Sequence, residues 1–296
     1  MIYLVGVSSK ALLAYHKRYP SERPNLLLSY ARRSKDCGKL IFNYRSLIGG
    51  LISDSGTYTL NSNPGDFADI ITLQGYQSYL QQLGRHFDFY FNFDQDFSRN
   101  GFDVNMANQL QLERAGLHPV PVVHDCYSNE IQYYINRGYD LVSIGSGELR
   151  DADVHELYRI VDKLYSQGIK VHFLGCTDYQ KLAYVPIYSA DSATWNQAAS
   201  RGHLLYWNPL MPGIDKKDKI CFVYDLPRKY MINHIDRHPH QREIEAYLNQ
   251  ELGYSISELK GTAGSINRAV ANIHYYVQLE KRIAAKHREL GFSFWI

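Results

Sequence analysis

The chain has 296 residues, of which 45% are hydrophobic, so it is long enough for one large domain such as an all-parallel barrel of roughly 250 residues. Its formal charge of +2 excludes a chain-wide basic surface, although residues 1–194 carry a net −2 and residues 195–296 a net +4. The four cysteines lie far apart without a C-x-x-C pair, which excludes a disulfide-stapled secreted domain.

The first residues predict a strand directly after Met1, without the basic region and long apolar stretch of a secretory signal. No run reaches the roughly 18 apolar residues that a membrane span needs. We therefore expect a cytoplasmic protein that has no membrane partner.

Eight short apolar runs bounded by polar or glycine turns predict β-strands, at residues 2–7, 25–30, 50–53, 87–93, 120–124, 141–144, 170–174 and 187–190. Most of these runs are apolar throughout, as in strands that are buried on both faces of a parallel sheet. Between them, helical periodicity covers residues 66–84, 105–115, 128–137 and 151–167, with expected helix ends at Gly84, Gly116, Gly138 and Gly168. Eight alternating units favour a closed (β/α)8 TIM barrel in the α/β class over an open, doubly wound sheet. No G-x-G-x-x-G motif follows the first strand, which further disfavours a dinucleotide fold.

From about Trp195 the pattern changes, and helices are predicted at residues 242–252 and 266–290. We predict a barrel domain that carries the chemistry at residues 1–205, and a mostly helical C-terminal extension, packed on the barrel, at residues 206–296.

Basic residues of this extension allow more than one interpretation. The histidine-rich stretch 233–240 is a solvated loop, a phosphate contact or a metal site, and Pro239 disfavours the continuous helix that a site from His234 and His238 needs. In the last helix, Lys281, Arg282, Lys286 and Arg288 form either a solvated face or a contact with a polyanion.

Polar side chains follow most of the predicted strands at the end where a barrel enzyme keeps its chemistry. They are Asp54, Asp94, Asp96, His124, Asp125, Glu148, His172 and Asp191. Helix capping or an Asx turn explains any one aspartate in such a place. Capping does not explain why so many of them converge on one mouth, so we expect an active site there.

Several short motifs resemble one family in their order and spacing. Residues 51–56 read L-I-S-D-S-G and are similar to the D-S-G motif of the tRNA-guanine transglycosylase (queuine tRNA-ribosyltransferase) superfamily. F-N-F-D at residues 91–94 resembles its strand-four aspartate, and S-I-G-S-G-E at residues 143–148 resembles its glycine-rich base-binding turn. K-V-H-F-L-G at residues 170–175 and S-A-D-S at residues 189–192 resemble its last two strands. The resemblance covers roughly residues 45–195.

Enzymes of this family exchange a guanine in a polynucleotide for a 7-deazaguanine base, so the resemblance implies a pentosyltransferase. Asp191 matches the nucleophile, which attacks C1′ of the nucleoside and forms a covalent glycosyl-enzyme. Asp54 matches the second essential carboxylate, which handles protons as the bases leave and arrive. These roles require one ionised carboxylate and one that exchanges protons near neutral pH.

The resemblance also implies a base pocket for a nucleotide that has left its stack. Asp94 matches the residue that reads the guanine-like edge, and the backbone amides of Gly145 to Gly147 approach the ring oxygen because glycine has no side chain. Glu148 matches a carboxylate behind that turn. The expected substrate-binding set is completed by Ser55, His124, Ser146 and His172. No cofactor and no metal are expected.

Departures from the family pattern bear on the polymer. His124 stands where the bacterial tRNA enzymes carry the glutamine of a Q-G motif. Those enzymes also carry a C-x-C-x-x-C…H zinc site, whereas here only Cys221 follows Asp191, and one cysteine cannot build a thiolate zinc site. The nucleophile strand reads S-A-D-S-A-T-W. This zinc-free form resembles the phage and bacterial branch that inserts 7-deazaguanines into DNA.

We therefore expect DNA and a base such as preQ0 as partners, and the cytoplasm of the host if a phage encodes the protein. The alternatives are a tRNA-guanine transglycosylase, a non-catalytic nucleic-acid-binding barrel subunit, and a metal-dependent hydrolase that uses Asp54, His124, His172 and Asp191. A homodimer or an accessory protein remains open.

Overall fold

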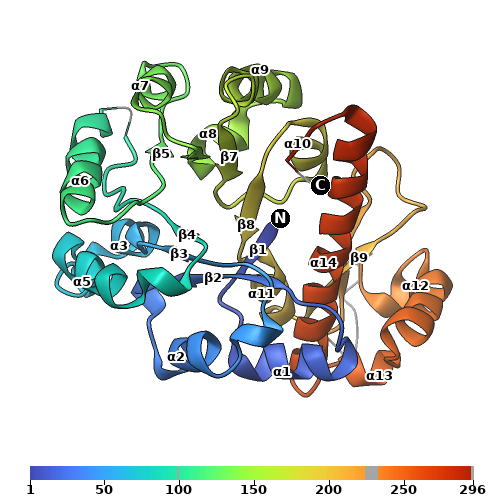
Figure 1. Cartoon of the computed structure of the whole chain (residues 1–296). Coiled ribbons are helices and arrows are strands. Elements are labelled where there is room, and N and C mark those ends of the chain that lie inside the picture. The colour runs from blue at the N-terminus through green and yellow to red at the C-terminus, as the bar shows by residue number, and fades with distance from the viewer. Residues whose placement is uncertain (99, 224–232, 295–296) are drawn as a thin grey trace.

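The computed structural model describes residues 1–98, 100–223 and 233–294. Eight parallel strands form its central sheet: β1 (Ile2–Val5), β2 (Asn25–Ser29), β3 (Leu51–Asp54), β4 (Phe89–Tyr90), β5 (Val122–Val123), β6 (Leu141–Ile144), β7 (Lys170–Phe173) and β8 (Ser189–Ser192). Their spatial order is β4-β3-β2-β1-β8-β7-β6-β5, so the first strand pairs with the last. The strands curl around a common centre (Figure 1).

The sheet closes between β4 and β5 through an isolated parallel bridge from Phe91 to Val120. The Val120 N–H donates to the Tyr90 carbonyl at 2.7 Å, and the Asn92 N–H donates to the Val120 carbonyl at 2.9 Å. The predicted (β/α)8 barrel is therefore confirmed.

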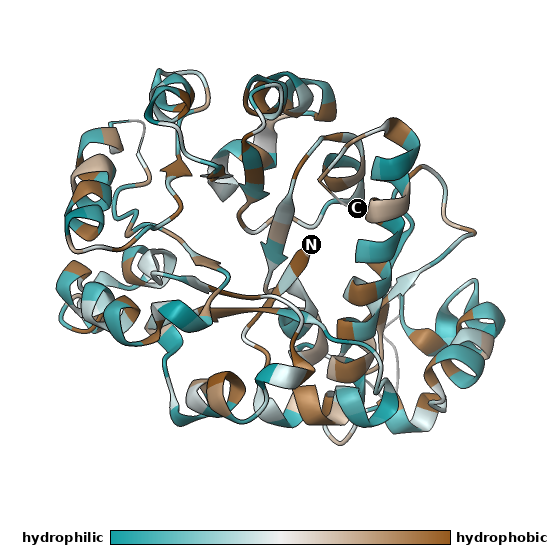
Figure 2. Cartoon of the chain, in the orientation of Figure 1, coloured by the Kyte–Doolittle hydropathy of each residue, from teal (hydrophilic) through white to brown (hydrophobic). Residues whose placement is uncertain are grey.

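Helices surround the strands as an outer layer: α1 (Ser9–Arg18), α2 (Lys35–Phe42), α3 (Thr57–Ser62), α4 (Pro64–Phe67), α5 (Leu73–Leu83), α6 (Phe102–Arg114), α7 (Glu130–Arg137), α8 (Ser146–Asp151), α9 (Val154–Tyr165), α10 (Tyr179–Tyr184) and α11 (Thr194–Ser200). Helix α9 shows the pattern: Leu157, Ile160, Val161 and Leu164 form its buried face. Brown, hydrophobic segments in Figure 2 concentrate on the strands, and the helices carry both brown and teal residues. One apolar face on each helix and apolar strands together make the core.

Two predicted helices are each divided in the structure. The stretch 66–84 becomes α4 and α5, because the Thr72 side chain caps α5 by accepting from the Gly75 N–H. The stretch 151–167 becomes the end of α8 followed by α9, which Asp153 caps. Gly116, Gly138 and Gly168 have positive φ as expected, but Gly84 has φ −53° and the chain continues there as a 3-10 helix. Gly84 therefore ends α5 as predicted, although without the positive φ of the other three glycines.

The C-terminal part contains a two-stranded antiparallel sheet, β9 (His203–Trp207) and β10 (Lys217–Cys221), that was not expected in a mostly helical extension. Helices α12 (Gln241–Tyr247), α13 (Ile256–Leu259) and α14 (Ser265–Leu290) follow, with a π-helical turn at Leu248–Leu252. The predicted boundary after residue 205 falls within β9. Residues 224–232 and 295–296 of the predicted extension lie outside the described residues.

Helix α14 packs against α1, α10 and α11 of the barrel (Figure 1). Its Glu280 carboxylate accepts from the backbone N–H of Ile2 at 2.7 Å and from the Asn25 side chain at 2.9 Å, at the amino ends of β1 and β2. Asn272 accepts from the Leu205 N–H at 2.8 Å and donates to the Trp195 carbonyl at 3.0 Å. These contacts fix α14 on the barrel along its length.

An ionic cluster around Glu22 connects the segment after α1 with α14. Lys281 donates to the Glu22 carboxylate at 2.8 Å, and His274 lies 3.5 Å from it; Tyr15 also donates to it. Burial alone would raise the pKa of Glu22, but the contacts with His274, Lys281 and Tyr15 lower it to about 2.

No helix in the described part of the chain is long and apolar enough to cross a membrane.

Candidate active site

A pocket of about 800 Å³ opens at the carboxyl ends of the strands. Three aspartates line it: Asp54 at the end of β3, Asp94 after β4 and Asp191 on β8. The other predicted site residues that line it are Ser55, His124, Gly145, Ser146, Gly147 and Glu148. His172 does not line the pocket. The barrel topology thus brings together side chains that are far apart in sequence.

The Asp191 carboxylate is held through one of its two oxygens. Its Oδ1 accepts from the Gly175 N–H at 2.9 Å and from His172 Nε2 at 3.2 Å. Within the described residues, no hydrogen bond reaches Oδ2. Asp191 is 7% exposed, and its position on the pocket wall leaves Oδ2 to face a ligand. A carboxylate anchored in this way is suited to nucleophilic attack.

His172 lies beneath the pocket and positions Asp191. It is fully buried, with its ring 4.8 Å from that of Phe91. Burial lowers its pKa, although the hydrogen bond with Asp191 opposes that shift. An ionised carboxylate can only accept, so a neutral His172 carries its proton on Nε2, and its Nδ1 accepts from the Ser189 hydroxyl at 2.8 Å. The sequence assigned His172 to substrate binding, whereas its contacts here are with protein groups.

Asp54 occupies a different environment. Its Oδ1 accepts from the Ser29 hydroxyl at 2.8 Å and from the Gly56 N–H at 2.5 Å. Burial is the main cause that raises the pKa of Asp54 to about 7; the charges of Asp191 and Asp94 add to the rise, and both hydrogen bonds oppose it. Near neutral pH this carboxyl can therefore both give and take a proton.

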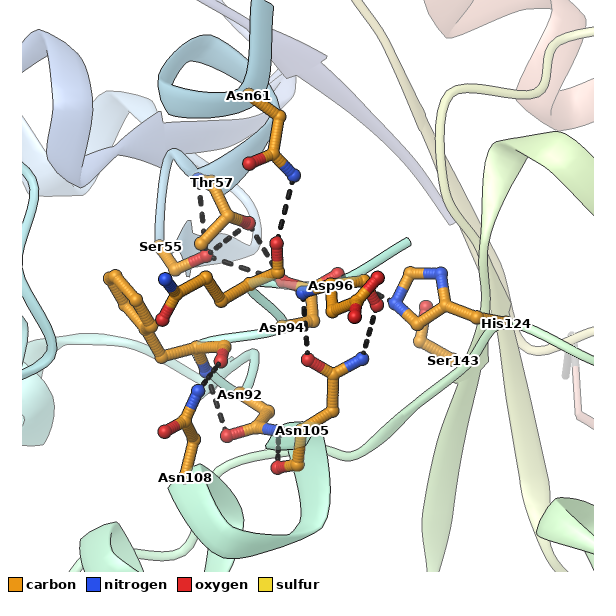
Figure 3. Close-up of polar contacts among 12 residues, drawn as sticks. Ser55, Thr57, Asn61, Asn92, Asp94, Asp96, Asn105, Asn108, His124 and Ser143 are labelled. Atoms are coloured by element: carbon orange, nitrogen blue, oxygen red, sulfur yellow. Dashed lines mark hydrogen bonds and ion pairs between the residues drawn. The ribbon is translucent and has the colours of Figure 1, made fainter. Parts of the chain in front are cut away.

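Asp94 is bonded through both oxygens (Figure 3). Oδ1 accepts from Thr57 Oγ1 at 2.9 Å and from Ser55 Oγ at 3.4 Å, and Oδ2 lies 3.1 Å from His124 Nε2. Its side chain is 9% exposed. Since a carboxylate oxygen accepts about two hydrogen bonds, Oδ2 keeps capacity for a ligand donor.

Asparagine side chains hold the segment after Asp94 (Figure 3). Asn105 accepts from the Asp96 N–H at 3.0 Å and donates to the Asp96 carbonyl at 2.6 Å. Asn108 donates to the Phe93 carbonyl and Asn61 to the Gln95 carbonyl, both at 2.9 Å. Sequence reasoning missed these residues. Their spacing could have indicated two of them, because Asn105 and Asn108 are three positions apart and so share a face of the predicted helix.

His124 contacts Asp94 through Nε2. Burial alone would lower its pKa, but the hydrogen bond and charge of Asp94, with the charges of Glu130 and Asp96, raise it. The buried Glu130 accepts from the His124 backbone N–H at 2.9 Å, and burial raises the pKa of Glu130 itself. Phe97 stacks on the His124 ring at 5.2 Å. These contacts fix the imidazole against Asp94.

The turn after β6 needs one correction. The resemblance implied that the Gly145 amide contacts the base. In the structure this N–H donates to the Val123 carbonyl at 2.9 Å, so it is part of the sheet and is not available to a ligand in the pocket. A Cβ at Gly145 would stand 3.0 Å from His124 Nδ1, so close packing favours glycine there. Ser146 and Gly147 are exposed at the start of α8, and Glu148 is half-buried.

Further residues of the pocket were not expected from the sequence. They are Val5, Gly56, Thr57, Tyr58, Phe91, Phe97, Ser98, Arg150, Leu174, Ser192, Ala193, Thr194 and Gln197. Thr57 and Tyr58 directly follow the D-S-G motif, so their place next to the strand end was the available signal. Tyr58 is 72% exposed at the mouth.

The histidine-rich stretch is engaged inside the protein. His238 Nε2 lies 3.1 Å from the Asp218 carboxylate, and His240 Nδ1 lies 2.8 Å from the Asn208 side-chain amide. Over residues 1–98, 100–223 and 233–294, no group of three or more His, Cys, Asp or Glu side chains has an arrangement that could hold a metal ion.

Fold and pocket together define an α/β barrel with a site of three aspartates at the carboxyl ends of its strands. No protein-family model matches the chain, and no curated protein matches its sequence significantly.

Proposed function

We propose that this protein is a transglycosylase that exchanges guanine in DNA for a 7-deazaguanine base such as preQ0 through a covalent aspartyl intermediate. The observation that carries the proposal is the contrast between two carboxylates in one pocket. Asp191 lines the pocket and is anchored through Oδ1, with no hydrogen bond to Oδ2 from the described residues, whereas burial raises the pKa of Asp54 to about 7. Base exchange at C1′ requires this pair: an ionised nucleophile and a group that moves protons.

In the first half-reaction, Asp191 Oδ2 attacks C1′ of the target deoxyguanosine. The C1′–N9 bond breaks, and its electron pair leaves with the guanine. Protonated Asp54 supplies the proton that makes the departing base neutral. The anchoring of Asp191 through His172 and Gly175 keeps the nucleophilic oxygen in place, which saves the entropy of orienting it.

The second half-reaction runs in the opposite direction with a different base. The 7-deazaguanine gives its N9 proton to ionised Asp54, and N9 attacks C1′. The bond from C1′ to Asp191 breaks, which returns both carboxylates to their initial states. A single proton carrier serves both halves because its pKa lies near neutral pH.

Base recognition falls to Asp94 and the start of α8. In this proposal Asp94 accepts from N1–H and the exocyclic amine of the base while His124, Thr57 and Ser55 keep its carboxylate oriented. The amides of Ser146 and Gly147 then serve the ring oxygen, since the Gly145 amide is taken by β5. The base reaches this pocket only after leaving its stack in the polynucleotide.

The choice of DNA rests on the resemblance to the zinc-free branch. Only Cys221 follows Asp191, so the zinc site of the tRNA enzymes has no counterpart in this sequence.

The test is incubation of the purified protein with radiolabelled preQ0 and either DNA or tRNA. We expect label in DNA, together with a protein–DNA adduct that survives denaturation and is lost in Asp191→Asn. Incorporation into tRNA alone would overturn the DNA assignment. An adduct that persists in Asp191→Asn would remove this residue as the nucleophile. Failure of both labelling and adduct formation on either polymer would favour a non-catalytic subunit.

A further inference from the structure

The charged side chains around the pocket mouth are unevenly distributed. On the side formed by the loops after β1 and β2 lie Lys10, Arg32, Arg33 and Lys35, all exposed. The loops after β4, β5 and β6 present Asp96, Asp125 and Glu148 on the other side, with Arg150 beside them. The described residues of the mouth therefore have a basic side and a more acidic side.

The basic residues form one continuous ridge. Helices α1 and α2 pack together, as Figure 1 shows at the lower edge of the barrel. Their first turns are joined because Ser9 donates through its N–H, at 2.8 Å, and through its hydroxyl to the Asp36 carboxylate. Lys10 directly follows Ser9 and Lys35 directly precedes Asp36, so the contact between Ser9 and Asp36 brings the two lysines into the same region.

The ridge borders the pocket directly. A Cβ added to Gly56 would stand 2.4 Å from the Cβ of Ala31, so the D-S-G turn lies against the residue before Arg32. Ser29, at the end of the same strand β2, donates to Asp54. The segment from Ser29, which contacts the pocket residue Asp54, to Lys35 therefore connects the pocket with the ridge.

None of the four ridge cations has a carboxylate within ion-pair distance in the described part of the chain. Arg33 is anchored, with its guanidinium 4.2 Å from the centre of the Tyr30 ring and hydrogen-bonded to the Ile70 carbonyl. The one carboxylate among them, Asp36, is already bonded to Ser9. The ridge therefore keeps a net positive charge, since Asp36 offsets only one of its cations.

The basic tail, which the sequence offered as a polyanion contact, is directed elsewhere. Glu280 of α14 bonds to the amino ends of β1 and β2, which is the end of the barrel opposite the pocket. Lys281 pairs with Glu22 and Lys286 with Glu289, and Arg282 lies over the Trp207 ring. These three side chains therefore have partners within the protein.

We propose that Lys10, Arg32 and Lys35 bind the phosphate backbone of the DNA strand next to the target guanine, so that the strand crosses the mouth along the β1–β2 side. This inference rests on the proposed function, because it takes the pocket as the place where the extruded base sits. Phosphates are attracted to unpaired cations and repelled by the carboxylates across the mouth. Backbone contacts of this kind position the strand without reading its sequence.

The test compares two variants that each lose three positive charges. The ridge variant is Lys10→Gln/Arg32→Gln/Lys35→Gln. The control variant is Lys17→Gln/Arg114→Gln/Arg288→Gln, which changes exposed residues in the last turns of α1, α6 and α14, away from the pocket. Circular dichroism and thermal melting check that both variants are folded.

Binding of a fluorescent single-stranded oligodeoxynucleotide with one guanine is titrated at several salt concentrations. A single-strand contact contributes ~0.7 to the slope of log K against log salt, so the ridge variant is expected to lose about 2 of that slope and roughly 100-fold in affinity at 0.1 M salt. The control variant should bind like the wild type.

Equal losses in both variants, or none in either, would overturn the ridge while exchange by the wild type still stands. A wild type that exchanges the base in RNA alone, with the ridge variant losing RNA affinity, would overturn DNA as the ridge's ligand. A wild type without affinity for either polymer would overturn the ridge and the proposed function together.

Discussion

Replacing Asp54 with asparagine separates two effects of a buried carboxyl, one on stability and one on catalysis. Burial and neighbouring charges raise the pKa of Asp54 from its ordinary 3.8 to about 7 in the folded protein. Between these two values the unfolded chain ionises at this residue while the folded protein keeps the proton. The fold therefore loses stability as the pH rises through this window, and the loss is complete once the pH exceeds the folded-state pKa.

The magnitude follows from the two pKa values. At ~1.36 kcal/mol for each pH unit, the difference between 3.8 and about 7 makes ionised Asp54 cost about 4 kcal/mol at high pH. Part of this cost is already present at pH 5, so the stability of Asp54→Asn relative to the wild type should rise by roughly 2 to 3 kcal/mol between pH 5 and pH 8. For a chain of 296 residues this corresponds to roughly 4 °C in melting temperature.

The assay is urea or thermal unfolding of both proteins across this pH range, with Asp69→Asn as the control for the loss of one exposed carboxylate. Exchange activity of Asp54→Asn should fall by about 10²- to 10⁴-fold, since the variant cannot carry a proton. A stability difference that does not change between pH 5 and pH 8 would refute the raised pKa, and with it the assignment of Asp54 as proton carrier.

Three further outcomes are expected. His172→Phe removes the ring donor to Asp191 and should lower kcat about 10- to 100-fold with little change in KM, as measured by steady-state exchange; an unchanged kcat would contradict a positioning role. Glu22→Gln should lower the free energy of unfolding at neutral pH by up to about 3 kcal/mol in chemical unfolding, because folding lowers the pKa of Glu22 from 4.5 to about 2. The wild type should lose the same stability as the pH falls from 4.5 through 2. Gly56→Ala meets both a φ of +78° and the close Ala31 side chain, so we expect a loss of more than about 1 kcal/mol in melting experiments; unaltered stability would show that the turn can relax.

The barrel could be predicted because its strands are buried on both faces and therefore read as continuous apolar runs. The segment 170–174, for example, becomes β7 with only Lys170 exposed. The grouping of Asp54 and Asp191 at one mouth also followed from topology, since parallel strands end on the same side.

Other features depend on three-dimensional contacts that residue order does not contain. His172 is on β7 but does not line the pocket. Only its contacts with Phe91 and Ser189 show that it is buried beneath the pocket and supports Asp191. The use of the Gly145 amide by Val123 depends on the pairing of β5 with β6. The β9–β10 hairpin follows the eighth strand, so the regular alternation that identified the barrel gave no reason to expect it.

The closure between β4 and β5 has a consequence for motion. Every other neighbouring strand pair of the barrel shares two or more registered residues, whereas this seam has the single bridge from Phe91 to Val120. We therefore expect the amides of Asn92 and Val120 to exchange with deuterium before those of β1 and β8. Asp94 lies three residues beyond Phe91, so we expect local opening at this seam to displace the Asp94 carboxylate while Asp54 and Asp191 stay in place on strands with more paired residues.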